Sequence, residues 1–386
     1  MVIEMNNDLI SELKNWVLQG NKIAIYCAGL HGGIFCRLLK KLEIEINVFI
    51  DNDVNKIGKK IDGISCVSPQ EINNTYKIII CTGIEKYRSV VDQAISQGLT
   101  NIIDFRGVID ALILNHKEDY LDLLIQQYYE LPADPFYTYE GELNNDEYNS
   151  IMCKNGKIAV YTSIFGSYDN LYEPLVFPDN IDYYYISDER PQNIKSHCWI
   201  DAKTIIPSDI HSPIKRNRYI KMHPHLIFPN YKYSIYVDAN VRILKDLTIL
   251  IRKSKSGISV FQHPKRDCLY YEALTIVNHK RVDPVDVVKQ INRYFIEGMP
   301  IHFGLPELPF LAREHKKKLC VSIMETWWKE FDTGAQRDQL SFPYALWKNK
   351  VSLQDVALLG NCVRSSEHLH FYEHYSESKR IKNDKL

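Results

Sequence analysis

The stretch Tyr233-Ser-Ile-Tyr-Val-Asp-Ala-Asn240 decides the fold class of this chain. Residues 234–237 form a short, mostly apolar run typical of a buried strand, and polar residues follow at Asp238 and Asn240. Ligands of open α/β sheets bind at the carboxyl ends of strands. The two polar residues are two positions apart, so both can face one divalent cation where the chain leaves the extended state. An ordinary strand followed by an Asx turn is the alternative.

The composition describes a globular protein with room for two or three domains. The chain has 386 residues, 45% of them hydrophobic and 25% charged, with a formal net charge of -1. We therefore expect no nucleic-acid partner. The nine cysteines are scattered without a CxxC pair, which favours free cytosolic thiols over disulfides or zinc ligands.

Targeting signals are also missing from the sequence. The start MVIEMNNDLI lacks the basic and apolar regions of a signal peptide, and no apolar run has the length of a membrane span. We expect a cytoplasmic protein that works, if at a membrane, from the inner face as a peripheral protein. No oligomeric state is predicted.

The first third of the chain has the order of a Rossmann-like unit: strand, glycine turn, helix, strand. Its apolar runs are residues 22–27, 47–50 and 77–81. Gly29, Gly32 and Gly33 depart from the G-x-G-x-x-G pattern, and Asp51 follows the second strand where a ribose-binding acid is expected. Dinucleotide binding and a module used for packing or another ligand both stay open.

The domain boundary falls in an irregular connector rich in Pro, Asp, Asn and Tyr. The predicted organisation is a Rossmann-like domain at 1–110, a helical and irregular linker at 111–156, a second α/β domain at 157–375 and a charged tail at 376–386.

The second domain starts again as a nucleotide-binding α/β unit, with strands that end in polar residues. Apolar runs predict strands at 157–162, 181–187, 234–237 and 257–262. Residues 305–309 (Leu-Pro-Glu-Leu-Pro) read as a structured loop, 319–323 as a short strand and 325–331 as a helix.

Charged residues flank the organising strand on both sides in sequence. Lys215, Arg218 and Lys221 share one face of a helix that begins at Pro213, and that face could hold a diphosphate or be a solvated surface. Asp338 and Gln339 start another helix, where they could meet a substrate or cap the helix.

Five ordered blocks of the second domain together resemble a GT-A type glycosyltransferase. The blocks are residues 161–169 (YTSIFGSYD), 215–225 (KRNRYIKMHPH), 236–240 (YVDAN), 262–266 (QHPKR) with Tyr271-Glu272, and 337–342 (RDQLSF). The likeness is to glycosyltransferase-like domains of bacterial polysaccharide loci and plant mucilage proteins, which are distantly similar to glycosyltransferase family 8. Residues 20–105 resemble a small nucleotide-binding-like domain attached to many bacterial sugar-modifying enzymes.

The resemblance implies a GT-A fold, a nucleotide-sugar donor, Mn²⁺ or Mg²⁺, and hexosyl transfer to a glycan or polysaccharide acceptor, as in capsule or lipopolysaccharide synthesis. The implied metal ligands are Asp238, Asn240, His370 and His368, with Asn240 in place of the usual second carboxylate. The implied donor-binding residues are Thr162, Ser163, Phe165, Tyr168, Arg218, Lys221, Asp238, His263 and Arg266. The implied catalytic residues are Asp338, Gln339 and Glu272.

Both stereochemical courses stay open, with Gln339 or Asp338 placing the acceptor in a retaining reaction and Asp338 or Glu272 acting as base in an inverting one. Two other functions also stay open. One is a nucleotide-sugar-modifying oxidoreductase that uses the N-terminal unit, and the other is a binding protein without catalysis.

Overall fold

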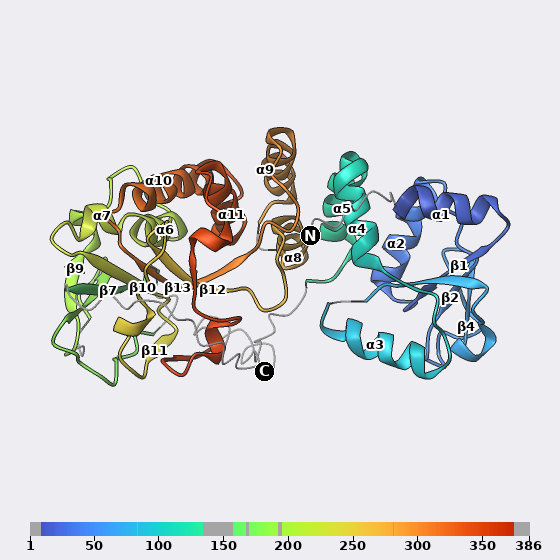
Figure 1. The fold of residues 1–386 in the computed structure, drawn as a ribbon, viewed down its shortest axis with the longest axis horizontal. Helices are drawn as coiled ribbons and strands as arrows, with labels where there is room; N and C mark the ends of the chain where they lie inside the picture. The colour runs from blue at the N-terminus through green and yellow to red at the C-terminus, as the bar shows by residue number, and fades with distance from the viewer. Residues whose placement is uncertain are drawn as a thin grey trace. The chain divides into compact units, whose positions relative to one another are not determined.

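The computed structural model describes residues 9–82, 84–133, 157–166, 170–191, 195–280 and 282–373. It divides into two compact units, Met1–Pro135 with Ala273–Phe295, and Phe136–Glu272 with Ile296–Leu386 (Figure 1). The predicted tail at 376–386 and the predicted donor residue Tyr168 lie outside the described residues. Each unit is described by itself.

Unit 1 is built on a sheet with the strand order β3-β4-β2-β1-β5-β6. Every neighbouring pair is parallel except β3 with β4. The strands are β1 Lys22–Tyr26, β2 Val48–Ile50, β3 Lys60–Ile61, β4 Ile64–Val67, β5 Tyr76–Ile80 and β6 Ile102–Asp104. Its helices from the first part of the chain are α1 Leu9–Leu18, α2 Leu30–Lys41, η1 Pro69–Glu71, α3 Ile84–Ser96, α4 Phe105–Asn115 and α5 Lys117–Glu130.

The turn from β1 to α2 explains one of the glycines. A Cβ atom on Gly32 would lie 2.2 Å from the carbonyl oxygen of Cys27, whose φ is 84°. The carboxylate of Asp51 accepts hydrogen bonds from the Ala28 amide and the Lys56 ammonium, each at 2.9 Å. Gly32 thus allows α2 to pack closely against the turn at Cys27. The Asp51 carboxylate is hydrogen-bonded to Ala28 and Lys56 within unit 1. Nucleotide binding by unit 1 stays a prediction.

A later segment of the chain returns to unit 1. The unit takes in Ala273–Phe295, which covers most of α8 (Leu269–Asn278) and α9 (Pro284–Glu297). The ring of Phe295 meets the buried ring of Tyr120 edge-on at a centroid distance of 5.6 Å. Residues 157–375 therefore do not all belong to unit 2.

Unit 2 contains a sheet with the order β14-β12-β13-β10-β7-β8-β9. Strand β13 is antiparallel to β10 and β12, and the other neighbours are parallel. The strands are β7 Ile158–Ser163, β8 Ile181–Ser187, β9 Cys198–Asp201, β10 Tyr233–Val237, β12 Ile258–Gln262, β13 Pro306–Arg313 and β14 Ala357–Leu358. A second small sheet pairs β11 Val241–Ile243 with β15 Leu369–Phe371. The predicted mixed α/β fold class is confirmed.

Two local predictions were wrong. Residues 305–309 are not a loop, since β13 begins at Pro306. Pro306 is the first residue of its strand, and Pro309 lies where the pairing of β13 with β12 shifts register, and such irregularities tolerate a missing N–H. Residues 319–323 are not a strand but part of α10, Lys318–Thr333. Their apolar residues continue at helical spacing toward Trp327, a period that a short window conceals.

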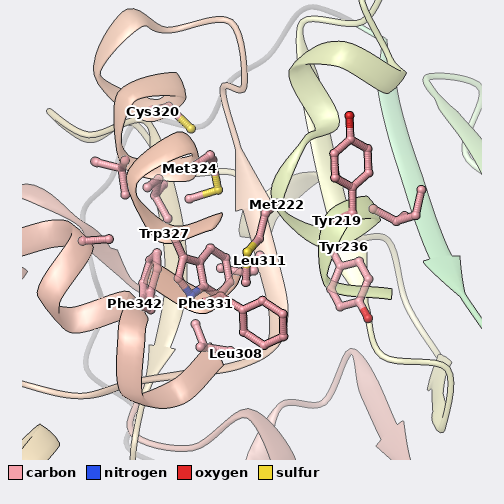
Figure 2. Packing of buried hydrophobic residues seen from close by; sticks show 14 of the residues in the cluster. Tyr219, Met222, Tyr236, Leu308, Leu311, Cys320, Met324, Trp327, Phe331 and Phe342 are labelled. Carbon is pink, nitrogen blue, oxygen red and sulfur yellow. The ribbon is translucent and has the colours of Figure 1, made fainter. Parts of the chain in front are cut away.

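Helices cover one face of the unit 2 sheet and share a hydrophobic core cluster with it. Helices α6 (Pro213–Met222), α10 and α11 (Asp338–Lys348) direct Met222, Trp327 and Phe342 into this cluster (Figure 2). Trp327 is fully buried. Truncating such an aromatic side chain costs about 3–5 kcal/mol, so this cluster holds α6, α10 and α11 against the sheet.

Short elements complete unit 2: η2 Ala202–Thr204, α7 Pro224–Ile227, η3 Thr248–Leu250, η4 Leu353–Asp355 and η5 Val363–Ser365. Across the residues that the structure describes, no helix combines the length and apolar character needed to cross a bilayer.

Candidate functional site

The predicted site residues gather at one edge of the unit 2 sheet. Strands β7, β8, β10 and β12 run in the same direction, so their carboxyl ends lie at one edge, where the antiparallel β13 begins. The amide of Asp238 donates to the carbonyl of Pro309 at 2.9 Å. At this edge, Thr162, Asp238 and His263 lie at or next to the carboxyl ends of β7, β10 and β12. Ligands of open α/β sheets bind at such ends, as the sequence predicts.

A buried ionic cluster forms where α11 meets α6. The Asp338 oxygen Oδ2 lies 2.8 Å from Lys221 Nζ and 2.9 Å from Arg218 Nε. The Lys221 side chain is 1% exposed. Burial opposes ionisation of Asp338, but the charges of Arg218 and Lys221 outweigh it and hold the pKa of that carboxyl well below its usual range. Asp338 is therefore ionised at neutral pH, whereas burial lowers the pKa of its partner Lys221.

The surroundings of Lys221 and Asp338 hold both groups in place. Lys221 Nζ lies 5.1 Å from the ring centroid of Tyr236 and 5.9 Å from that of Trp327, within the range of cation–π attraction. The Lys221 carbonyl accepts from Arg313 at 2.6 Å. The indole N–H of Trp327 donates to the Asp338 carbonyl at 3.1 Å. The ends of both helices are thus tied to the core.

Asp238 adds a second carboxylate to this cluster. Burial, together with the charge and hydrogen bond of Asp238, raises the pKa of the Tyr236 hydroxyl well above its usual range. The charge of Asp238 also acts on Arg218 and Lys221. The charge of Arg337 also acts on Asp338. Two carboxylates thus lie among three basic side chains.

Of the predicted metal ligands, Asp238 and Asn240 offer oxygen atoms suited to a hard cation. The Asn240 amide nitrogen donates to the Tyr372 carbonyl at 2.8 Å, which leaves its Oδ1 as the atom that could bind a cation beside Asp238. His370 lies opposite Arg242 in the backbone pairing of β15 with β11, and its side chain is exposed. His368 is buried. Within the described ranges, no three His, Cys, Asp or Glu side chains converge as a metal site. Phosphate oxygens and water would have to complete the coordination, as they commonly do for Mg²⁺.

A small pocket opens beside Asp238, between β7 and β10. Thr162, Tyr172 and His197 contribute to its lining. The Thr162 hydroxyl is buried and has no hydrogen-bond partner among the described residues. Burial lowers the pKa of His197 to about 4, so its ring is neutral. The pocket therefore offers a hydroxyl and an uncharged imidazole next to Asp238.

Two predicted donor residues serve the framework around this pocket. The Asn217 side-chain nitrogen donates to both the carbonyl and the hydroxyl of Ser163 at 3.0 Å. The Arg216 guanidinium lies 5.1 Å from the centre of the Phe165 ring, which belongs to the core. These contacts fasten the end of β7 to α6.

The segment after β12 forms another buried group of charges. Arg266 Nε donates to Glu272 Oε2 at 2.7 Å, and both side chains are less than one tenth exposed. Arg266 also lies 2.9 Å from the ring nitrogen Nε2 of His263. Burial lowers the pKa of His263 to about 4. The predicted base Glu272 is thus held in a buried ion pair.

Gln339 links the start of α11 to the start of β13. Its side-chain nitrogen donates to the carbonyl of Pro306 at the start of β13, and its backbone amide donates to Asp338 Oδ1 at 3.1 Å. Both Asp338 and Gln339 therefore lie at the sheet edge, where the sequence analysis expected them to meet a substrate.

Sequence reasoning missed three residues near the site. His197 precedes β9 without a motif around it, and Arg313 ends an apolar run. Glu307 lies in the segment that was read as a loop, two residues before the carbonyl that binds the Asp238 amide. An antiparallel strand assignment for residues 306–313 would have placed Glu307 at the edge.

Comparison with known proteins finds a matching family model for each of two parts of the chain. The family model of the TOD1/MUCI70 glycosyltransferase-like domain matches residues 137–374, more than half of the chain, and the model of the C2185-like N-terminal domain matches residues 19–103. A probable hexosyltransferase, MUCI70 of Arabidopsis thaliana, is 23% identical over 255 residues, covering 58% of this chain and 43% of that protein. The alkaline ceramidase TOD1 of the same plant is 22% identical over 223 residues, covering 48% and 47%. The chain spans less than half the length of these relatives.

Solved glycosyltransferases are more distant. GlyE of Streptococcus pneumoniae TIGR4 shares 15% identity at a TM-score of 0.28, covering 53% of this chain and 45% of its own. The bifunctional WbbM shares 11% at a TM-score of 0.32, covering 71% and 51%. Scores this low carry no weight, so the assignment rests on the family model. The chain belongs to the TOD1/MUCI70 family and carries its glycosyltransferase-like domain over residues 137–374.

Proposed function

We propose that this protein is a hexosyltransferase that moves a sugar from a nucleoside-diphosphate donor to a glycan or polysaccharide acceptor. The observation that carries the proposal is the buried cluster of Arg218, Lys221 and Asp338 beside Asp238 at the sheet edge. Family membership supports the reaction class. We propose that it acts in the cytoplasm, at the inner face of the membrane, in surface polysaccharide synthesis.

The reaction breaks the bond between the anomeric carbon and the diphosphate, and negative charge develops on the leaving group. Arg218 and Lys221 are preorganised cations in a site that excludes water, where such groups stabilise charge most effectively. Asp338 holds them in place before the donor arrives. Thr162, whose buried hydroxyl has no hydrogen-bond partner among the described residues, would contact the donor beside Asp238.

A divalent cation would be held by Asp238 and by Asn240 through Oδ1. When bound, Mn²⁺ or Mg²⁺ would add positive charge that stabilises the departing diphosphate. His370 and His368 stay expectations from the family resemblance.

Hydrolysis of a lipid amide, the activity in the name of the second relative, is less well supported. The ceramidase aligns with 48% of this chain, whereas the probable hexosyltransferase aligns with 58% of it. An oxidoreductase function is also less well supported, because Asp51 is engaged by Ala28 and Lys56.

A thermal-shift panel tests the proposal. UDP-glucose, UDP-galactose, UDP-N-acetylglucosamine and GDP-mannose are each added with and without MnCl₂. A ligand at about 100 times its Kd stabilises the folded state by about 2.7 kcal/mol. If no nucleotide sugar shifts the melting temperature, the proposal is wrong.

Substitution of the cation site separates binding from chemistry. Asp238→Ala should abolish UDP release and transfer but leave the protein folded, because Asp238 lies beyond the end of β10. Asp209→Ala changes an exposed carboxylate and serves as the control. Wild-type turnover in Asp238→Ala would contradict the assignment of the cation to this residue.

A further inference from the structure

Asn240 ties the turn after β10 to the strand β15 near the end of the described chain. Val241 pairs with Phe371 in the antiparallel ladder of β11 and β15, so Asn240 lies opposite Tyr372. Opposite residues of a hydrogen-bonded antiparallel pair exchange two N–H···O bonds. The Tyr372 amide donates to the Asn240 carbonyl at 2.8 Å, and the return bond to the Tyr372 carbonyl, also 2.8 Å, comes from the Asn240 side chain. Asn240 thus extends the small sheet by one pair.

Tyr372 brings two further rings to the same turn. Its ring stacks on that of Tyr172 at a centroid distance of 4.0 Å and an interplanar angle of 9°, and the ring of His370 meets it edge-on at 4.7 Å. Tyr172 and Asp238 line the same small pocket. The three rings, which we call the Tyr372 cluster, therefore lie beside Asp238, and Asn240 ties them to the turn that carries this carboxylate.

The bond from Asn240 to the Tyr372 carbonyl requires an amide. A carboxylate accepts hydrogen bonds and donates none, so aspartate at position 240 would bring a carboxylate oxygen against the carbonyl oxygen of Tyr372. Asn240 is only 4% exposed, and a buried acceptor that loses its donor destabilises the fold. The sequence has Asn240 where the resemblance to glycosyltransferases implies a second carboxylate, and this contact is a physical reason for the amide.

We propose that Asn240 is a positioning residue that holds the Tyr372 cluster against the turn of Asp238 as a wall of the donor site. This inference rests on the glycosyl transfer proposed above. Asn240→Asp adds a charged oxygen of the kind that divalent cations prefer, and it should nevertheless impair the enzyme. A residue whose only role is to bind the cation would show the opposite response.

The test compares wild type with Asn240→Asp, Asn240→Ala and Tyr172→Ala, the last of which removes the stacked ring and leaves Asn240 in place. Asn180→Asp is the matched control. The Asn180 amide donates at 3.1 Å to the Thr248 hydroxyl, which can itself donate to a carboxylate. Thermal melts establish that each variant is folded, and Tyr172→Ala carries the test if neither Asn240 variant folds.

Two quantities are measured on the full chain. Hydrogen–deuterium exchange of the peptide containing residues 369–372 reports the attachment of β15 in protein without metal or substrate. UDP release from the four nucleotide sugars, with water as acceptor and MnCl₂ at saturation, reports the reaction. Because the metal is saturating, weaker cation binding does not explain a loss of turnover.

We expect both Asn240 variants to raise the exchange rate of residues 369–372 about tenfold or more, and Asn180→Asp to leave it at the wild-type value. In Asn240→Asp, kcat/KM for UDP release should fall about tenfold or more, mainly through a higher KM for the donor, because the wall is displaced while Asp238 remains. Tyr172→Ala should change exchange and KM in the same directions.

The outcomes separate the inference from the proposed function. Wild-type exchange in the Asn240 variants would show that the amide does not hold β15. Raised exchange with an unchanged or higher kcat/KM in Asn240→Asp would make the contact structural and overturn its role in the reaction. If wild type releases no UDP from any of the sugars, the proposed function fails, whereas the exchange rates still decide whether Asn240 holds Tyr372.

Discussion

The ionic cluster at Asp338 makes a demanding prediction about stability. Asp338→Asn removes one charge and leaves Lys221 and Arg218 buried beside each other. Each cation lies within 2.9 Å of the Asp338 oxygen. At an effective dielectric constant near 20, each approach is worth about 6 kcal/mol of attraction, most of which desolvation offsets. Removing the shared partner of buried charges typically costs about 3–5 kcal/mol, and we expect a loss of that size.

Urea unfolding followed by tryptophan fluorescence measures this loss, because Trp327 donates directly to the Asp338 carbonyl. Asp332→Asn is the matched control. Its ion pair with Lys215 at 2.7 Å is partly exposed on both sides and should contribute less than about 1 kcal/mol. Asp338→Asn and Asp332→Asn should therefore differ clearly in urea midpoint.

The pH dependence provides a second readout. Because the folded-state pKa of Asp338 is depressed, its stabilisation is present above the ordinary carboxyl range near pH 4 and is lost as pH falls below it. Asp338→Asn should lack this part of the acid sensitivity. A loss no larger than that of Asp332→Asn, with the acid sensitivity unchanged, would refute the cluster as the anchor of the site.

Gly32→Ala should destabilise unit 1 by about 1–3 kcal/mol in urea unfolding, because its Cβ would meet the Cys27 carbonyl at 2.2 Å. Gly29→Ala, with open space around the new Cβ, should change stability by less than about 0.5 kcal/mol, and equal losses in the two variants would discount the close contact. Tyr161→Phe removes the hydroxyl that accepts from Arg313 at 2.5 Å and should cost about 1–3 kcal/mol by the same measurement. An unchanged midpoint in Tyr161→Phe would mean that Arg313 finds another acceptor.

The strand framework was predictable because buried parallel strands read as short apolar runs. Runs at 158–163, 181–187 and 233–237 are strands, and their polar ends meet at one edge because the strands are parallel. The antiparallel β13 was missed because its prolines resemble a loop, although both occupy positions that need no N–H. Glu307 was missed with it.

The partners of the basic helix could not be read from the sequence. Lys215, Arg218 and Lys221 were correctly placed on a helix before the organising strand. Lys215 pairs with Asp332, whereas Arg218 and Lys221 share Asp338, and these partners lie more than a hundred residues away along the chain. Spacing on a helix fixes a common direction but not what the rest of the fold brings against it.

The discontinuous composition of unit 1 has a consequence for biosynthesis. Its first segment is complete by about residue 133, but Ala273–Phe295 emerges from the ribosome only after half of unit 2 has been made. At 5–20 residues per second, this delay is roughly 8–30 s. During that interval the surface of α5 around Tyr120 lacks its partner Phe295, so unit 1 completes this part of its packing only after residue 295 has been made.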